Sequence, residues 1–235
     1  MSGMLYGVGV GPGDPELLTL KAVRLLQECD LIGIPSRSKE RCTAYKIALQ
    51  AVPELAEKEV ISIPIPMTTE RERLEAAYEQ GSEMLIDALK EGKQIVFLNL
   101  GDPTIYSTYM SLHERVKKAG YAAELVSGVP SFCAVAAELG IAIASGDEKI
   151  QILPGFYYPE ESGGFEGTGI IMKSAGKITE IRKKLMRLEA ERGIKAYAVT
   201  NCGMEDQKVC REIRDLKEDA GYFTTLIIRE ESGSC

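Results

Sequence analysis

The sequence has little of the chemistry on which several common enzyme classes depend. Histidine occurs once, at His113, so neither a Ser-His-Asp triad nor a metal site built from several histidines has support within this chain. Because His113 falls in a helical run, we expect it to be an incidental surface residue. The six cysteines include no Cys-x-x-Cys pair, which argues against a zinc site and a redox pair.

Charge and hydrophobic runs exclude further classes. The net charge of −7 disfavours a nucleic-acid partner, because phosphate binding needs clustered Lys and Arg, but it permits a local basic pocket for a small anion. No apolar run approaches the ~20 residues needed to span a bilayer, and no signal peptide is visible at the N-terminus. We therefore expect a cytoplasmic protein with reduced cysteines and no membrane partner.

The length and the pattern of elements predict two α/β domains. A chain of 235 residues, 45% of them hydrophobic, can build two ordinary cores. Short apolar runs predict strands, and amphipathic periodicity predicts helices between them. Strand-helix alternation in the first half implies a mostly parallel sheet, and the second half ends in successive strands that imply a mixed sheet. We place the domains at 1–127 and 128–235.

The expected elements are as follows. Strands are predicted at 4–10, 30–34, 59–65, 94–100, 122–126, 149–153, 169–173, 195–200, 208–214 and 222–229, with the last two paired to each other. Helices are predicted at 15–28, 42–51, 69–91, 105–119, 131–140 and 177–191. Thr69 and Glu72 have the spacing of a capping box, and the glycine-rich run 161–169 is expected to be an exposed loop.

The first twenty residues carry the strongest local signal. The strand that begins near Leu5 runs into Gly7-Val-Gly-Val-Gly-Pro-Gly-Asp14, after which Pro15 stands at a first helical position with Asp14 as its cap. Such a loop brings backbone amides close to a bulky ligand. A dinucleotide fingerprint needs glycines at its first, third and sixth places. Counted from Gly7 or from Gly9 the sixth place is not glycine, so a Rossmann oxidoreductase is disfavoured.

Three further loops follow predicted strands or the domain junction. They are Gly101-Asp-Pro-Thr-Ile-Tyr-Ser-Thr108, Ser127-Gly-Val-Pro-Ser131 and Asn201-Cys-Gly-Met204. Each alone is compatible with an ordinary turn, in which Asp102 would cap a helix. Ligands of open parallel sheets collect outside the carboxyl ends of the strands, and the Gly-Asp-Pro loop lies there.

Taken together, these loops resemble the tetrapyrrole methylase superfamily over nearly the whole chain. Its members transfer methyl groups from S-adenosylmethionine to porphyrin and corrin precursors. The resemblance rests on Gly-x-Gly-Pro-Gly-Asp-x-x-Leu-Leu-Thr at the N-terminus and on Gly-Asp-Pro-x-x-Tyr-Ser-Thr in the middle. It implies two α/β domains with a cofactor cleft between them, not a Rossmann fold, and a homodimer.

Within the superfamily the sequence is most similar to the C-20 methyltransferases of precorrin-2 and cobalt-factor II in cobalamin synthesis. Ile34-Pro-Ser-Arg37, Gly128-Val-Pro-Ser131 and Met172-Lys173 carry this likeness, with Ser127 standing where many members have proline. We expect methylation of the C-20 bridging carbon of cobalt-factor II. Open alternatives are precorrin-2 C-20 methylation, uroporphyrinogen-III methylation and, in a different class, a non-catalytic nucleotide-binding module.

The resemblance also implies site residues. The residues implied to bind S-adenosylmethionine are Pro12, Gly101, Asp102, Pro103, Ile105, Pro130, Ser131, Met172, Cys202, Gly203 and Met204. Since methyl transfer needs alignment in a dry site more than it needs strong acids and bases, few titratable groups are expected. Asp102 and Tyr106 are candidates for removing the proton. Arg37, Lys39, Arg41 and Lys173 are candidates for binding the carboxylates of a tetrapyrrole. No metal site is expected.

Overall fold

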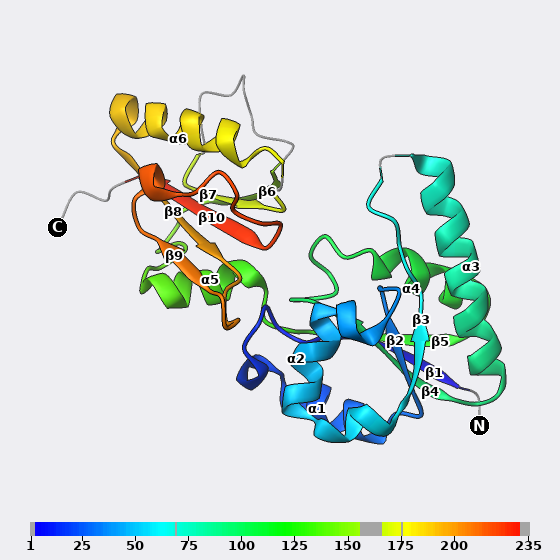
Figure 1. Ribbon diagram of the computed structural model, residues 1–235. Coiled ribbons are helices and arrows are strands. Elements are labelled where there is room, and N and C mark those ends of the chain that lie inside the picture. The colour runs from blue at the N-terminus through cyan, green and yellow to red at the C-terminus, as the bar shows by residue number, and fades with distance from the viewer. Residues whose placement is uncertain (1–2, 69, 156–165, 175, 231–235) are drawn as a thin grey trace. The chain divides into compact units, whose positions relative to one another are not determined.

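A computed structural model describes residues 3–68, 70–155, 166–174 and 176–230 (Figure 1). The chain divides into two compact units, Met1–Pro130 and Ser131–Cys235, and each holds one five-stranded sheet. Thr69 and residues 161–165 of the glycine-rich run lie outside the described residues, and the N-cap of the helix that follows Thr69 is Glu70. In the part of the chain that is described, no helix has both the length and the apolar character needed to cross a bilayer.

The elements of the first unit are β1 (Met4–Gly9), α1 (Leu20–Glu28), β2 (Leu31–Ile34), α2 (Thr43–Ala51), β3 (Glu59–Ser62), α3 (Arg71–Lys90), β4 (Gln94–Asn99), α4 (Tyr109–Lys118) and β5 (Ala122–Val126). The elements of the second unit are α5 (Ser131–Leu139), β6 (Ile150–Pro154), β7 (Thr168–Met172), α6 (Ile178–Arg192), β8 (Ile194–Thr200), β9 (Lys208–Cys210) and β10 (Thr224–Glu230). Short 3-10 helices occupy Pro15–Leu17, Lys39–Arg41, Pro53–Glu57 and Ile213–Asp215.

The first sheet is parallel throughout, in the order β3-β2-β4-β1-β5. Its central strand β4 is buried from Ile95 to Asn99, as expected of a strand covered on both faces. Helices α3 and α4 pack on one face around Leu5, Ile95 and Phe97, and α1 and α2 lie on the opposite side (Figure 1). Every strand predicted for this half exists, with shifts at the ends, and so does every helix except that the one predicted at 15–28 is divided.

The second sheet is mixed, as expected, in the order β6-β7-β10-β8-β9. Only β6 and β7 pair in parallel, and the other neighbours are antiparallel. Helix α6 packs on one face through Ile178, Ile181 and Leu185. Helix α5 covers the other face, where Val135 belongs to a separate cluster with Ile227 (Figure 1).

The helix predicted at 15–28 is two helices. Asp14 caps the 3-10 helix Pro15–Leu17 by accepting from the amide of Glu16 at 2.8 Å. The backbone then becomes extended, and Thr19 caps α1 by accepting from the amide of Ala22 at 3.1 Å. Two successive caps therefore divide a segment whose periodicity alone indicates one helix.

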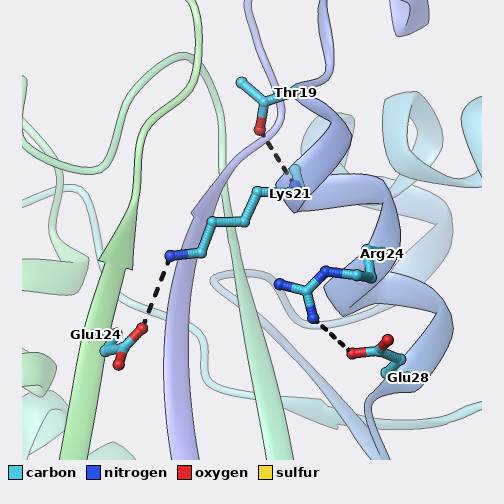
Figure 2. Close-up of polar contacts among 6 residues, drawn as sticks. Thr19, Lys21, Arg24, Glu28 and Glu124 are labelled. Atoms are coloured by element: carbon cyan, nitrogen blue, oxygen red, sulfur yellow. Dashed lines mark hydrogen bonds and ion pairs between the residues drawn. The ribbon is translucent and has the colours of Figure 1, made fainter.

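Surface charges support α1 from outside, as Figure 2 shows. Lys21 reaches Glu124 on β5 with a nitrogen–oxygen distance of 3.8 Å, and Arg24 pairs with Glu28 one turn further along at 2.9 Å. The side chains in both pairs are about half exposed or more. Exposed pairs of this kind contribute about 0.2–1 kcal/mol each at most, so the position of α1 rests mainly on its buried face.

The predicted pairing of 208–214 with 222–229 is wrong. β10 lies between β7 and β8, and β9 pairs only with β8 at the sheet edge. The reason is burial: Leu226, Ile227 and Ile228 are almost fully buried and need neighbours on both sides, whereas Lys208 and Val209 are exposed. Neighbouring strands in sequence often pair, but here the more apolar strand takes the central position.

His113 is not a surface residue, contrary to the expectation. Only 7% of it is exposed, because its place one turn after Tyr109 puts it on the face of α4 that packs against the sheet. Its Nδ1 lies 3.3 Å from the hydroxyl of Tyr109, whose ring stacks on Phe97. Burial, with a smaller contribution from the charge of Lys117, lowers the pKa of His113 below its ordinary value of 6.5.

This burial predicts an acid-sensitive contribution to stability. Because the folded-state pKa is lower than the unfolded one, the unfolded chain binds more protons between the two values, and stability rises with pH across that window. The stabilising contribution of neutral His113 is fully present above the ordinary pKa of histidine, and it is lost as the pH falls toward the lowered pKa of the folded state. We therefore compare the free energies of unfolding of the wild type and of His113→Gln. We expect the value of the wild type minus that of the variant to decrease as the pH is lowered from about 7.5 to about 5. A constant difference in denaturant titrations across that range would contradict it.

Candidate functional site

The parallel sheet gathers four of the singled-out loops at one edge. The carboxyl ends of β1, β2, β4 and β5 share this edge because all four strands run in the same direction. The chain leaves β1 toward β2 on one side and leaves β4 toward β5 on the other. The first connection passes β4, the second passes β1, and their helices α1 and α4 lie on opposite faces of the sheet (Figure 1). Neighbouring strands whose connections leave on opposite faces open a crevice outside their ends, which is where open α/β sheets bind ligands.

Backbone contacts join the loops after β1 and β4. The amide of Gly101 donates to the carbonyl oxygen of Gly11 at 2.7 Å, and the amide of Gly11 donates back at 3.3 Å. The loop after β5 approaches as closely: a methyl group at Gly128 would lie 2.2 Å from the Gly101 carbonyl oxygen, and one at Gly9 would lie 2.5 Å from the same oxygen. Glycine at these positions lets three loops meet backbone to backbone.

Asp102 sits at this meeting point with 7% of its surface exposed. Its Oδ1 accepts from the amide of Thr104 at 2.8 Å and from the Thr104 hydroxyl at 2.5 Å. Its Oδ2 accepts from the amide of Gly128 at 3.0 Å. The carboxylate therefore organises the turn after β4 and also holds the loop after β5.

A second polar contact orders the rest of the Gly-Asp-Pro loop. Ser107 donates to the side-chain oxygen of Asn99 at 2.8 Å and accepts from the amide of Tyr109 at 3.1 Å. Tyr106 lies between the two anchored residues Thr104 and Ser107. It adopts a left-handed φ of 50°, and 39% of its surface is exposed. Helix α4 begins at Tyr109, four residues later than predicted, because this left-handed residue interrupts the helical backbone.

The basic candidates of the first unit follow β2. Arg37, Lys39 and Arg41 are exposed, and the last two lie in a 3-10 helix. Since β2 neighbours β4 in the sheet, this loop shares the edge that carries the Gly-Asp-Pro loop. Exposed cations at such an edge can bind carboxylates of an anionic ligand.

The second unit also gathers its predicted site residues at one sheet edge. β7 and β8 both pair antiparallel with β10, so their carboxyl ends flank its beginning. Met172 ends β7, and Cys202, Gly203 and Met204 follow β8. Ser131 reaches the same edge, because its hydroxyl lies 3.1 Å from that of Thr225 near the start of β10.

Side chains hold the turn after β8 in place. Asn201 has a left-handed φ of 53°, and its side-chain Nδ2 donates to the carboxylate of Asp206 at 2.6 Å. The backbone amide of Gly203 donates to the side-chain oxygen of Gln207 at 2.6 Å. The turn with the expected cofactor residues is therefore fixed by polar groups that follow it in the chain.

Lys173 is the third residue with an unusual backbone. Among the described residues, the non-glycine positions with left-handed φ are Tyr106, Lys173 and Asn201, and each follows a strand in a loop singled out above. Such strain costs on the order of 1–3 kcal/mol and is concentrated at functional sites. Burial lowers the pKa of the Lys173 ammonium group.

The sequence analysis did not single out several residues whose side chains hold the loops of the site in place. Asn99 carries a signal, since it is a polar residue at the end of a strand that is otherwise apolar. Thr104 stands two residues after an aspartate, the spacing of an Asx turn. Gln207 has no local signal, because its role depends on the fold of the turn that precedes it. In the part of the chain that the structure describes, no three His, Cys, Asp or Glu side chains are grouped to hold a metal ion.

Comparisons with known proteins agree with this architecture. The chain is 39% identical over 151 residues to a probable cobalt-precorrin-2 C(20)-methyltransferase of Methanocaldococcus jannaschii, a match that covers 64% of this chain and 63% of that relative. It is 27% identical over 239 residues to a precorrin-2 C(20)-methyltransferase of Sinorhizobium sp, covering 96% and 95%. The fold matches a uroporphyrin-III C-methyltransferase of Thermus thermophilus, solved with S-adenosylhomocysteine, with a TM-score of 0.69 at 22% identity over 97% of each chain.

The fold, the strand-end loops and these relatives define a methyltransferase built from two α/β units. The chain belongs to the Tetrapyrrole (Corrin/Porphyrin) Methylases, whose family model matches residues 4–216. The family resemblance expected from the N-terminal and central glycine motifs is thereby confirmed.

Proposed function

We propose that this protein uses S-adenosylmethionine to methylate the C-20 bridging carbon of cobalt-factor II in cobalamin biosynthesis. The observation that carries the proposal is the match to C(20)-methyltransferases, one of which extends over nearly the whole chain. The name of the Methanocaldococcus relative favours the cobalt-bearing substrate over the metal-free one. The cobalt ion then belongs to the substrate.

The residues present fit S-adenosylmethionine. The backbones of Gly9, Gly101 and Gly128 fill the space that side chains would otherwise take, so the loops after β1, β4 and β5 come together at the strand ends, where α/β sheets bind ligands. When bound, the cofactor supplies an electrophilic methyl group on a good leaving group. The residues that would hold it are Pro12, Gly101, Asp102, Pro103, Ile105 and Pro130 in the first unit and Ser131, Met172, Cys202, Gly203 and Met204 in the second.

The protein's own contribution is orientation, because the leaving group needs little activation. The ordered Gly-Asp-Pro loop positions main-chain groups, and the left-handed backbone presents Tyr106 between two anchored residues. We assign Tyr106 to assisting the loss of the proton from the methylated carbon. Arg37, Lys39, Arg41 and Lys173 bind the substrate's carboxylates in this proposal. A cytoplasmic homodimer is part of it, by family likeness.

An anaerobic incubation with substrate tests the proposal. The purified protein is mixed with S-adenosylmethionine and, in separate reactions, cobalt-factor II, precorrin-2 or uroporphyrinogen III, and the products are weighed by mass spectrometry. We expect one added methyl group, formed fastest on cobalt-factor II. If precorrin-2 reacts faster, the natural substrate is the metal-free one. If only uroporphyrinogen III reacts, the C-20 assignment is overturned. Cofactor binding without any transfer supports a non-catalytic binding module instead.

A further inference from the structure

Asp102 connects loops that come from three different strands. It follows β4, its Oδ2 accepts from Gly128 after β5, and its neighbour Gly101 pairs with Gly11 after β1. Apart from Asp102, the described polar contacts at this junction are between backbone groups. One side chain therefore supplies the link that reaches the β5 loop.

The glycine contacts explain why a side-chain link matters here. The backbones of Gly9 and Gly128 approach the Gly101 carbonyl so closely that neither position has room for a methyl group. Such positions contribute no side-chain packing of their own, and glycine gains more backbone freedom than other residues when released. The β5 loop therefore needs a directional contact to stay against the other two.

The hydrogen bonds of Asp102 also limit its chemistry. A general base needs an oxygen facing the proton that it removes. Oδ1 of Asp102 already accepts two hydrogen bonds from Thr104 and Oδ2 accepts one from Gly128, in a side chain that is nearly buried. Hydrogen bonds to an ionised carboxylate are about twice as strong as neutral ones, which suits a structural link.

We propose that Asp102 is a positioning residue: its carboxylate fixes the β5 loop and the Thr104 turn in the geometry that binds the cofactor, and it removes no proton. This inference rests on the proposed function for the identity of the cofactor. It replaces the proton-removing role for which Asp102 is a candidate with a positioning role, and it adds Thr104 and the Gly128 amide to the site.

The test uses Asp102→Asn in the full chain and measures three quantities. Asparagine keeps the shape of the side chain, but its single oxygen cannot accept from Thr104 and from Gly128 at once, so at least one of the two contacts is lost. We expect faster hydrogen exchange at the amide of Gly128 or of Thr104, an S-adenosylhomocysteine dissociation constant raised about tenfold in calorimetry, and a larger change in the cofactor KM than in kcat. The pH profile of kcat should keep the wild-type shape.

Thr104 provides a matched pair of variants. Thr104→Val removes the hydroxyl donor to Asp102 and should weaken S-adenosylhomocysteine binding in the same direction, whereas Thr104→Ser keeps the donor and should restore most of the affinity. If Asp102→Asn does not fold, this pair still tests the inference, because valine has nearly the shape of threonine.

The outcomes separate the two proposals. A fall in kcat of about 10²–10⁴-fold with unchanged S-adenosylhomocysteine affinity would make Asp102 a catalytic base and overturn the inference. Unchanged exchange at both the Gly128 and the Thr104 amides in Asp102→Asn overturns it as well. Failure of the wild type to bind S-adenosylhomocysteine refutes the proposed function, while the exchange of the Gly128 and Thr104 amides still decides whether Asp102 holds the two loops.

Discussion

Replacing Gly7 with alanine is expected to lower the free energy of unfolding of the first unit by about 3 kcal/mol, at the upper end of the usual cost of overpacking. The new methyl group would lie 1.9 Å from Cε1 of Tyr109. That ring has no room to move, because it is fully buried, stacks on Phe97 and contacts His113 through its hydroxyl. Guanidinium titration followed by circular dichroism measures the loss.

A double-mutant cycle identifies the cause. In a Tyr109→Ala background the ring is absent, so adding alanine at position 7 should cost little, and the two changes should be far from additive. Gly221→Ala is the matched control, since a methyl group there meets no atom within 4 Å and needs no left-handed backbone. Additive costs, or a Gly7→Ala protein as stable as the wild type, would contradict the packing described here.

Replacing Gly128 with alanine is expected to weaken S-adenosylhomocysteine binding by about 100-fold or more while leaving most of the fold intact. The methyl group would lie 2.2 Å from the carbonyl oxygen of Gly101. The obstacle is backbone, so relief requires moving a loop, and Gly101 is itself held by its bonds to Gly11. Misplacement by about 1 Å at a site of this kind costs on the order of 10²-fold.

The neighbouring residue supplies the control for this second change. Ser127 is exposed in the same loop, so Ser127→Ala alters the loop without adding an atom at the junction, and its affinity should stay near that of the wild type. Calorimetry with S-adenosylhomocysteine compares the two variants. A folded Gly128→Ala protein with wild-type affinity would mean that the junction of the three loops is not part of the cofactor site.

Local patterns in the sequence determined much of the architecture. The apolar runs that become β1, β4 and β10 are long enough to be recognised without tertiary information, and strand-helix alternation is sufficient for a parallel sheet. The glycine loops were recognisable because their spacing is unusual and because they recur after strands. Family membership follows from these motifs and is confirmed by the family model.

Tertiary structure decided what depends on partners distant in sequence. The central place of β10 follows from burial on both sides, which local pairing rules do not contain. The burial of His113 depends on the sheet beneath α4. The division of 15–28 into two helices is different, because its two caps, Asp14 and Thr19, are both local and both are used.

The role of Asp102 shows the same division most clearly. From the sequence alone one can predict that a Gly-Asp-Pro loop follows an apolar strand and that it belongs to a methylase motif. Only the fold brings the amide of Gly128, 26 residues away, to within 3.0 Å of that carboxylate. A hydrogen bond forms only when donor and acceptor lie close together in space, and the local sequence around Asp102 does not show which distant amide will reach it.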